Sequence, residues 1–112
     1  MRVRVLFLLL VTSLAFGQEI EVSGSRGVAE IEIPDTGWFQ AVSGRPVPQG
    51  ARLATWVDSS TGLSIVSGEA SAEVSLAPLS MVELASIAQP LGITLVAGSA
   101  DFDVRGLEVA VT

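Results

Sequence analysis

The chain of 112 residues contains no cysteine, histidine, lysine or tyrosine. Without cysteine no disulfide can staple the fold, so the domain must be held by packing alone, which suits a bacterial envelope protein better than a eukaryotic secreted one. Zinc sites built on histidine and cysteine are excluded. A serine nucleophile needs an adjacent base, and the lack of histidine and lysine excludes serine triads and dyads. These absences predict a protein that is not an enzyme and has no cofactor.

The first 17 residues have the three parts of a secretory signal peptide. Met1–Arg4 is cationic, Val5–Phe16 is mostly apolar, and Ala15–Gly17 offers small residues at the positions that a signal peptidase reads. The apolar run is shorter than the about 20 residues of a membrane-spanning helix. We therefore expect a chain that is exported to the bacterial periplasm or secreted, begins at Gln18 after cleavage, and has no stable membrane span.

The predicted mature chain, residues 18–112, is strongly acidic. It keeps four arginines against twelve aspartates and glutamates, a net charge of −8. Nucleic-acid binding requires basic surface, so we expect no nucleic-acid partner. Anionic lipid head groups would also repel such a chain. Its 95 residues are enough for one domain with a single modest core.

Short segments in which apolar and polar residues alternate recur along the chain, separated by turn residues. This rhythm predicts an all-β fold, a small sandwich or roll of short, mainly antiparallel strands. The expected strands are 18–22, 28–33, 38–42, 51–57, 63–66, 70–76, 94–97, 101–104 and 107–111.

The pattern includes one predicted turn and one ambiguous segment. Residues 47–50 (Val-Pro-Gln-Gly) fit a type I turn, and the following strand places Leu53, Thr55 and Val57 on its buried face. Ser80–Gln89 is ambiguous, because it contains a helix capping box and also continues the strand alternation. For it we expect a strand over residues 80–84, followed by one short helical turn.

An ordered string of glycines and apolar residues resembles the FecR-type extracytoplasmic domain over residues 28–112. Its members are Trp38, Val42, Gly44, Gly50, Leu53, Thr55, Ser59 or Ser60, Leu76, Pro78, Ser80, Val82, Leu84, Leu95, Gly98 and Val104. The chain departs from the family pattern at Ala51, where an aspartate is common, and it lacks the family's last segment, its anti-sigma segment and its membrane span. The resemblance thus implies an isolated, C-terminally shortened β module without transmembrane signalling.

Paired carboxylates are the remaining candidates for chemistry. Glu30 and Glu32 share one strand face, which we interpret as a solvated face rather than a glycosidase pair. Asp101 and Asp103 also share a face, but calcium needs six or more oxygen ligands, so we expect no metal site.

Four aromatic residues offer either a sugar-stacking platform or core packing. For Trp38, Phe39 and Phe102 the core is favoured. For Trp56 the preference is weaker, because it shares a face with Arg52.

The sequence therefore predicts an exported, non-catalytic β module that binds or scaffolds another cell-envelope protein. A strand edge is the expected contact, either with that protein or with a second copy of the chain, because residues 107–112 carry one charge, Glu108, and no proline. The alternative is a module that binds surface polysaccharide through Trp56 and nearby carboxylates. No catalytic, cofactor or metal residue is assigned.

Overall fold

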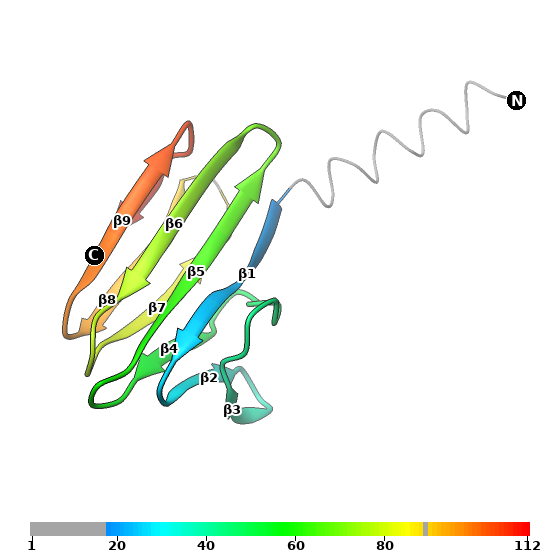
Figure 1. Cartoon of the computed structure of the whole chain (residues 1–112). Helices are drawn as coiled ribbons and strands as arrows, with labels where there is room; N and C mark the ends of the chain where they lie inside the picture. The colour runs from blue at the N-terminus through cyan, green and yellow to red at the C-terminus, as the bar shows by residue number, and fades with distance from the viewer. Residues whose placement is uncertain (1–17, 89) are drawn as a thin grey trace, which may run out of the picture.

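The computed structural model describes residues 18–88 and 90–112. Ten β-strands make up its regular structure, and no helix occurs among these residues (Figure 1). The strands are β1 (Gln18–Arg26), β2 (Ala29–Ile33), β3 (Gly37–Gln40), β4 (Arg52–Thr55), β5 (Ser60–Ser67), β6 (Ala70–Leu76), β7 (Met81–Ser86), β8 (Leu91–Ala97), β9 (Ala100–Arg105) and β10 (Val109–Val111). The predicted signal peptide lies outside the described residues.

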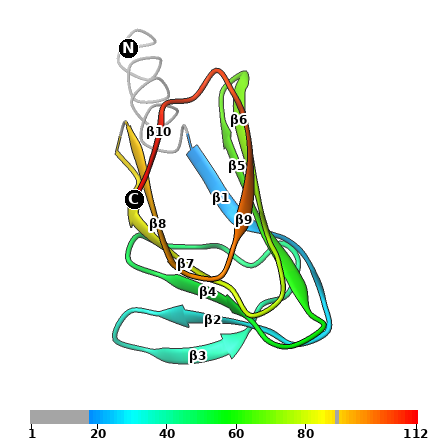
Figure 2. The same cartoon turned by 90° about the vertical axis from the view of Figure 1, so that its left-hand side faces the viewer.

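The strands form two sheets that face each other, as Figure 2 shows. One sheet has four strands in the order β1-β5-β6-β9, and the other has six in the order β10-β8-β7-β4-β2-β3. All neighbouring strands are antiparallel except β10 and β8, which are parallel. The prediction of an all-β sandwich of mainly antiparallel strands is therefore confirmed.

The core lies between the sheets because alternate residues of each strand point inward. In β6, for example, Ala72, Val74 and Leu76 are buried whereas Glu73 and Ser75 are exposed. The largest fully buried side chains are Val22, Ile31, Leu53, Leu63, Ile65, Val74, Val82, Leu84, Leu91 and Ile93.

The helical turn expected after Leu84 is wrong for the described residues. The segment continues as strand β7 through Ser86, and a register shift against β8 lies between Leu84 and Ser86. Pairing on both sides, with β4 and β8, outweighs the local capping signal.

The turn before β4 is shifted by one residue from its predicted place. Ala51 N donates to Pro48 O at 3.1 Å, and Gly50 has a φ of 88°. A positive φ at the third residue is typical of a type II turn, so the turn spans residues 48–51 and not 47–50. Val57, expected in the core, is 66% exposed because β4 ends at Thr55 and a turn follows.

The other prediction for β4 is confirmed, because Leu53 and Thr55 are both buried. The Thr55 hydroxyl donates to Ala77 O at 2.6 Å and accepts from Ser80 N at 2.9 Å. This pair of bonds fixes the end of β4 against the start of β7, and the same alternation directs Ala54 and Trp56 to the outside.

Candidate functional site

Both tryptophans lie on the surface, which corrects the expectation that they fill the core. Trp38 is 44% exposed and Trp56 is 54% exposed. Phe39 and Phe102, by contrast, are partly buried and pack against the core, as expected. The guanidinium of Arg45 lies over the Phe39 ring, 5.3 Å from its centroid. Because Phe39 packs against the core, its neighbour Trp38 on the same strand must point outward.

The outer face of the six-stranded sheet is built from two neighbouring rows of residues. Strand pairing sets the first row, which runs Trp38, Glu32, Arg52, Glu83, Thr94 and Thr112 from β3 to the end of β10. The second row runs Gln40, Glu30, Ala54, Met81 and Ala97. Trp56 follows Ala54 after one inward residue, so it stands beyond the second row on the same face.

A groove of about 390 Å³ lies over this part of the face and is lined by Glu30, Trp38, Ala54, Trp56 and Met81. The volume falls within the range of about 300–1,000 Å³ that is typical of small-molecule pockets. Ala54 is the smallest side chain of the lining and leaves the groove open between the indole rings. We call this feature the Trp38–Trp56 groove.

Trp56 is held in place at the groove by a hydrogen bond. Its indole Nε1 donates to Glu30 Oε1 at 2.8 Å, which ties the ring to β2. A second hollow of about 250 Å³ continues from it and shares Ala54, Trp56 and Met81. Leu79, which is 62% exposed, lines this extension.

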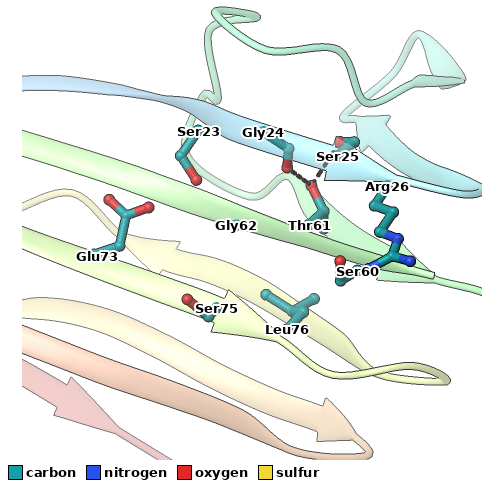
Figure 3. A pocket seen from close by; sticks show the side chains of 10 residues that line it. All are labelled: Ser23, Gly24, Ser25, Arg26, Ser60, Thr61, Gly62, Glu73, Ser75 and Leu76. Carbon is teal, nitrogen blue, oxygen red and sulfur yellow. Dashed lines mark hydrogen bonds between the residues drawn. The ribbon is translucent and has the colours of Figure 1, made fainter. Parts of the chain in front are cut away.

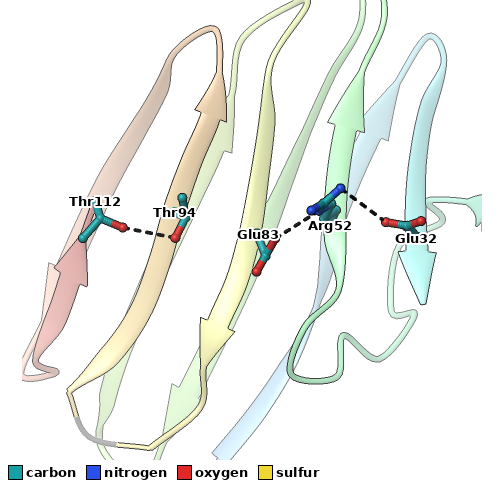
Figure 4. A network of polar contacts seen from close by, with 5 residues as sticks. All are labelled: Glu32, Arg52, Glu83, Thr94 and Thr112. Atoms are coloured by element: carbon teal, nitrogen blue, oxygen red, sulfur yellow. Dashed lines mark hydrogen bonds and ion pairs between the residues drawn. The ribbon is translucent and has the colours of Figure 1, made fainter. Parts of the chain in front are cut away.

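A row of polar side chains crosses the same face of the sheet from β2 to the end of β10 (Figure 4). Arg52 lies between two carboxylates, with Nε 3.0 Å from Glu83 Oε1 and Nη1 3.9 Å from Glu32 Oε1. Further along the row, the hydroxyls of Thr94 and Thr112 are 3.1 Å apart. The face thus combines two exposed indoles with carboxylates and one guanidinium, on strands β2, β3, β4 and β7 and, for Trp56, on the residue that follows β4.

The predicted pair Glu30 and Glu32 does lie on this face, but the two residues have different partners. Glu30 accepts from Trp56, and Glu32 contacts Arg52. Their shared strand face was predictable from the alternation in β2. Their position beside two tryptophans was not, because it depends on the pairing of β2 with β3 and β4.

Asp101 and Asp103 lie far from the groove in the strand order, on β9 at the edge of the other sheet. Asp103 contacts Arg105 at 3.5 Å, with both side chains well exposed. Residues 18–88 and 90–112 contain no cluster of three or more potential metal ligands. No helix in this part of the chain has the length and apolarity needed to cross a membrane.

A separate hollow of about 370 Å³ lies over β1, β5 and β6 of the other sheet and is rich in hydroxyls (Figure 3). Its central groups bond to the protein itself: Thr61 Oγ1 donates to Gly24 O at 2.8 Å and is 2.8 Å from Ser25 Oγ. These bonds secure the register shift of β1 between Val22 and Gly24. We interpret this hollow as structural.

The chain shows no match to a protein family model, to a curated protein or to a solved structure. The resemblance to the FecR-type domain therefore stays a prediction from sequence.

Proposed function

We propose that this chain is an exported, non-catalytic binding module that holds a polysaccharide of the cell surface in the Trp38–Trp56 groove. The observation that carries the proposal is the exposure of both tryptophans on one sheet face, with Trp56 fixed by Glu30. The FecR-type resemblance, which implies an extracytoplasmic β module, agrees with this role.

Sugar rings have the mixed chemistry that this face offers. The C–H face of a pyranose packs on an indole ring, and its hydroxyls bond to carboxylates and to a guanidinium. Glu32, Arg52 and Glu83 supply those polar groups on the same face. A wholly apolar ligand would instead have to desolvate these charges, which is costly.

The charges also indicate which polysaccharide fits. Two carboxylates, Glu32 and Glu83, flank the guanidinium of Arg52, and a third, Glu30, lines the groove and accepts from Trp56. An anionic polymer would meet repulsion from this face and from the acidic chain as a whole. We therefore propose a neutral polymer as the ligand.

Titration followed by tryptophan fluorescence tests the proposal directly, because the chain has only two tryptophans and both line the groove. A neutral glucan and its oligosaccharides should change the emission in a saturable way, whereas a polyuronic acid should not. Trp56→Ala should weaken binding by about 2 kcal/mol, or about thirtyfold in Kd, as expected for an aromatic that dominates a contact; calorimetry measures this variant, since one fluorophore is lost.

Ala54→Leu provides a variant that fills the groove without removing a contact group. Ala85→Leu is its matched control, because Ala85 is exposed on β7 and does not line the groove. Loss of glucan binding in the first variant but not in the second would locate the ligand. Equal binding by both variants would refute the groove as the site.

A second candidate function is docking of another envelope protein on the same face. Tryptophan, methionine and arginine are enriched at protein interfaces, and Trp38, Trp56, Met81 and Arg52 gather here. Cross-linking in the native envelope, followed by mass spectrometry, tests this candidate. A protein cross-linked at this face, together with no response to glucan, would favour it over polysaccharide binding.

A further inference from the structure

The strand β10 leaves one edge of the six-stranded sheet open among the described residues. Thr112 N donates to Ile93 O at 3.0 Å, and Leu95 N donates to Thr112 O at 2.9 Å. Both backbone groups of Thr112 therefore face β8. Because successive residues direct these groups to opposite edges of a strand, those of Val109 and Val111 face away from β8 and are available for pairing.

Two of the other sheet edges are protected in ways that β10 is not. The outer edge of β1 is bonded to residues 44–47 through three backbone hydrogen bonds. The edge strand β9 carries Asp101, Asp103 and Arg105, and such charges deter strand addition. The edge of β3 extends over only four residues and adjoins the Trp38–Trp56 groove.

We propose that β10 pairs antiparallel with β10 of a second copy of this chain, around a two-fold axis at Ala110. In this register Val109 lies opposite Val111 of the partner subunit and makes two backbone hydrogen bonds with it, and symmetry gives four in all. Glu108 lies opposite Thr112 of the partner subunit, so no like charges face each other. Edge pairing of this kind is an established mode of association.

Side-chain exposure supports the same contact. Val111 is 47% exposed although its neighbour on the same face, Val109, packs against the core. In the paired sheet, Val109 and Leu107 of the partner subunit approach the exposed part of Val111. A second copy thus covers an apolar side chain that the isolated sheet leaves in water.

The arrangement has a consequence that rests on the proposed function. The two-fold axis is perpendicular to the joined sheet, so both Trp38–Trp56 grooves lie on the same face. Four strand spacings separate each groove from the axis in the strand order, which places the grooves about 40 Å apart at about 4.8 Å per strand. A long polymer can then occupy both grooves and gain avidity, whereas a short oligosaccharide cannot.

Sedimentation velocity over a range of protein concentrations and salt concentrations tests the pairing. We expect a reversible monomer–dimer equilibrium that shifts toward the dimer as salt increases, because each copy is strongly acidic. The double variant Val109→Pro, Val111→Lys removes an outward N–H donor and adds an edge charge, and it should be monomeric. Val66→Lys, an exposed valine on β5, is the control for the added charge and should still dimerise.

A wild-type chain that stays monomeric at all concentrations and salts would overturn the proposal, as would a folded double variant that still dimerises. Hydrogen exchange of the wild type gives a second readout should the double variant not fold. The Val109 and Val111 amides should become protected as the protein concentration rises, and concentration-independent exchange of these amides would also overturn the pairing.

The failure of the pairing and the failure of the proposed function can be told apart. Trp56→Ala should weaken glucan binding by about thirtyfold and leave the dimer intact. The edge variant should keep its affinity for an oligosaccharide and lose at least about tenfold for the polymer. A dimer that binds no glucan refutes only the proposed function, and a monomer that binds glucan refutes only the pairing.

Discussion

Replacement of Gly50 by valine tests how the chain enters β4. Gly50 is the third residue of the turn over residues 48–51, with a φ of 88°. Its N–H donates to Leu84 O at 2.7 Å, which ties the turn to β7. A Cβ at this position would lie 3.1 Å from Cγ of Pro34, so a side chain here meets both backbone strain and a close neighbour.

The expected loss follows from these two effects. A left-handed conformation costs a residue with a Cβ about 1–2 kcal/mol, and the β-branched valine and the contact with Pro34 add to it, giving about 2–3 kcal/mol in the free energy of unfolding. For a domain of this size each kcal/mol lowers the Tm by about 4–8 °C. Gly50→Val should therefore melt about 10–20 °C below the wild type when followed by circular dichroism.

Gly44→Val is the matched control for the neighbour contact. Gly44 has nearly the same φ, 86°, but a Cβ there would meet no atom within 4 Å. Gly44→Val should lose only the stability that backbone strain costs, so its Tm should lie between those of the wild type and Gly50→Val. Equal losses in the two variants would show that the Pro34 contact contributes nothing, and an unchanged Tm for Gly50→Val would refute the turn geometry.

Three other predictions concern stability and processing. Thr55→Val should cost about 1–3 kcal/mol in urea unfolding, because it removes the partner of the buried Ser80 N–H and of the partly buried Ala77 carbonyl; Thr36→Val, at an exposed hydroxyl, should cost much less, and equal costs would contradict the role of burial. Thermal melts with and without a chelator should coincide, and a drop of several degrees would point to calcium at Asp101 and Asp103. The intact mass of the exported protein should correspond to a chain that begins at Gln18, and a mass that retains residues 1–17 would contradict cleavage.

The fold class was predictable because strand alternation is a local signal. The alternation of Ala72, Val74 and Leu76 with Glu73 and Ser75 identifies β6 and its buried face without further information. The end of a strand is less predictable. Val57 continues the alternation of β4, yet it lies in a turn, because the bonds of Thr55 end the strand.

The candidate site was predictable only in part, because it depends on which strands pair. The alternation in β4 places Trp56 with Arg52 and Ala54, and the sequence does favour exposure for that residue more than for Trp38. For Trp38 the useful signal is its neighbour Phe39, since only one of two adjacent strand residues can face the core. That both indoles line one groove with Glu30 follows from the β3-β2-β4 order, which no local pattern specifies.

Fluorescence titration of the Ala54→Leu and Ala85→Leu variants tests most directly whether the Trp38–Trp56 groove binds a neutral polysaccharide. Both variants keep the two tryptophans, so the same signal reports on each. We predict a saturable change with a neutral glucan in the wild type and in Ala85→Leu, and none in Ala54→Leu. A response to glucan that survives Ala54→Leu, or no response from the folded wild-type chain, would contradict binding in this groove.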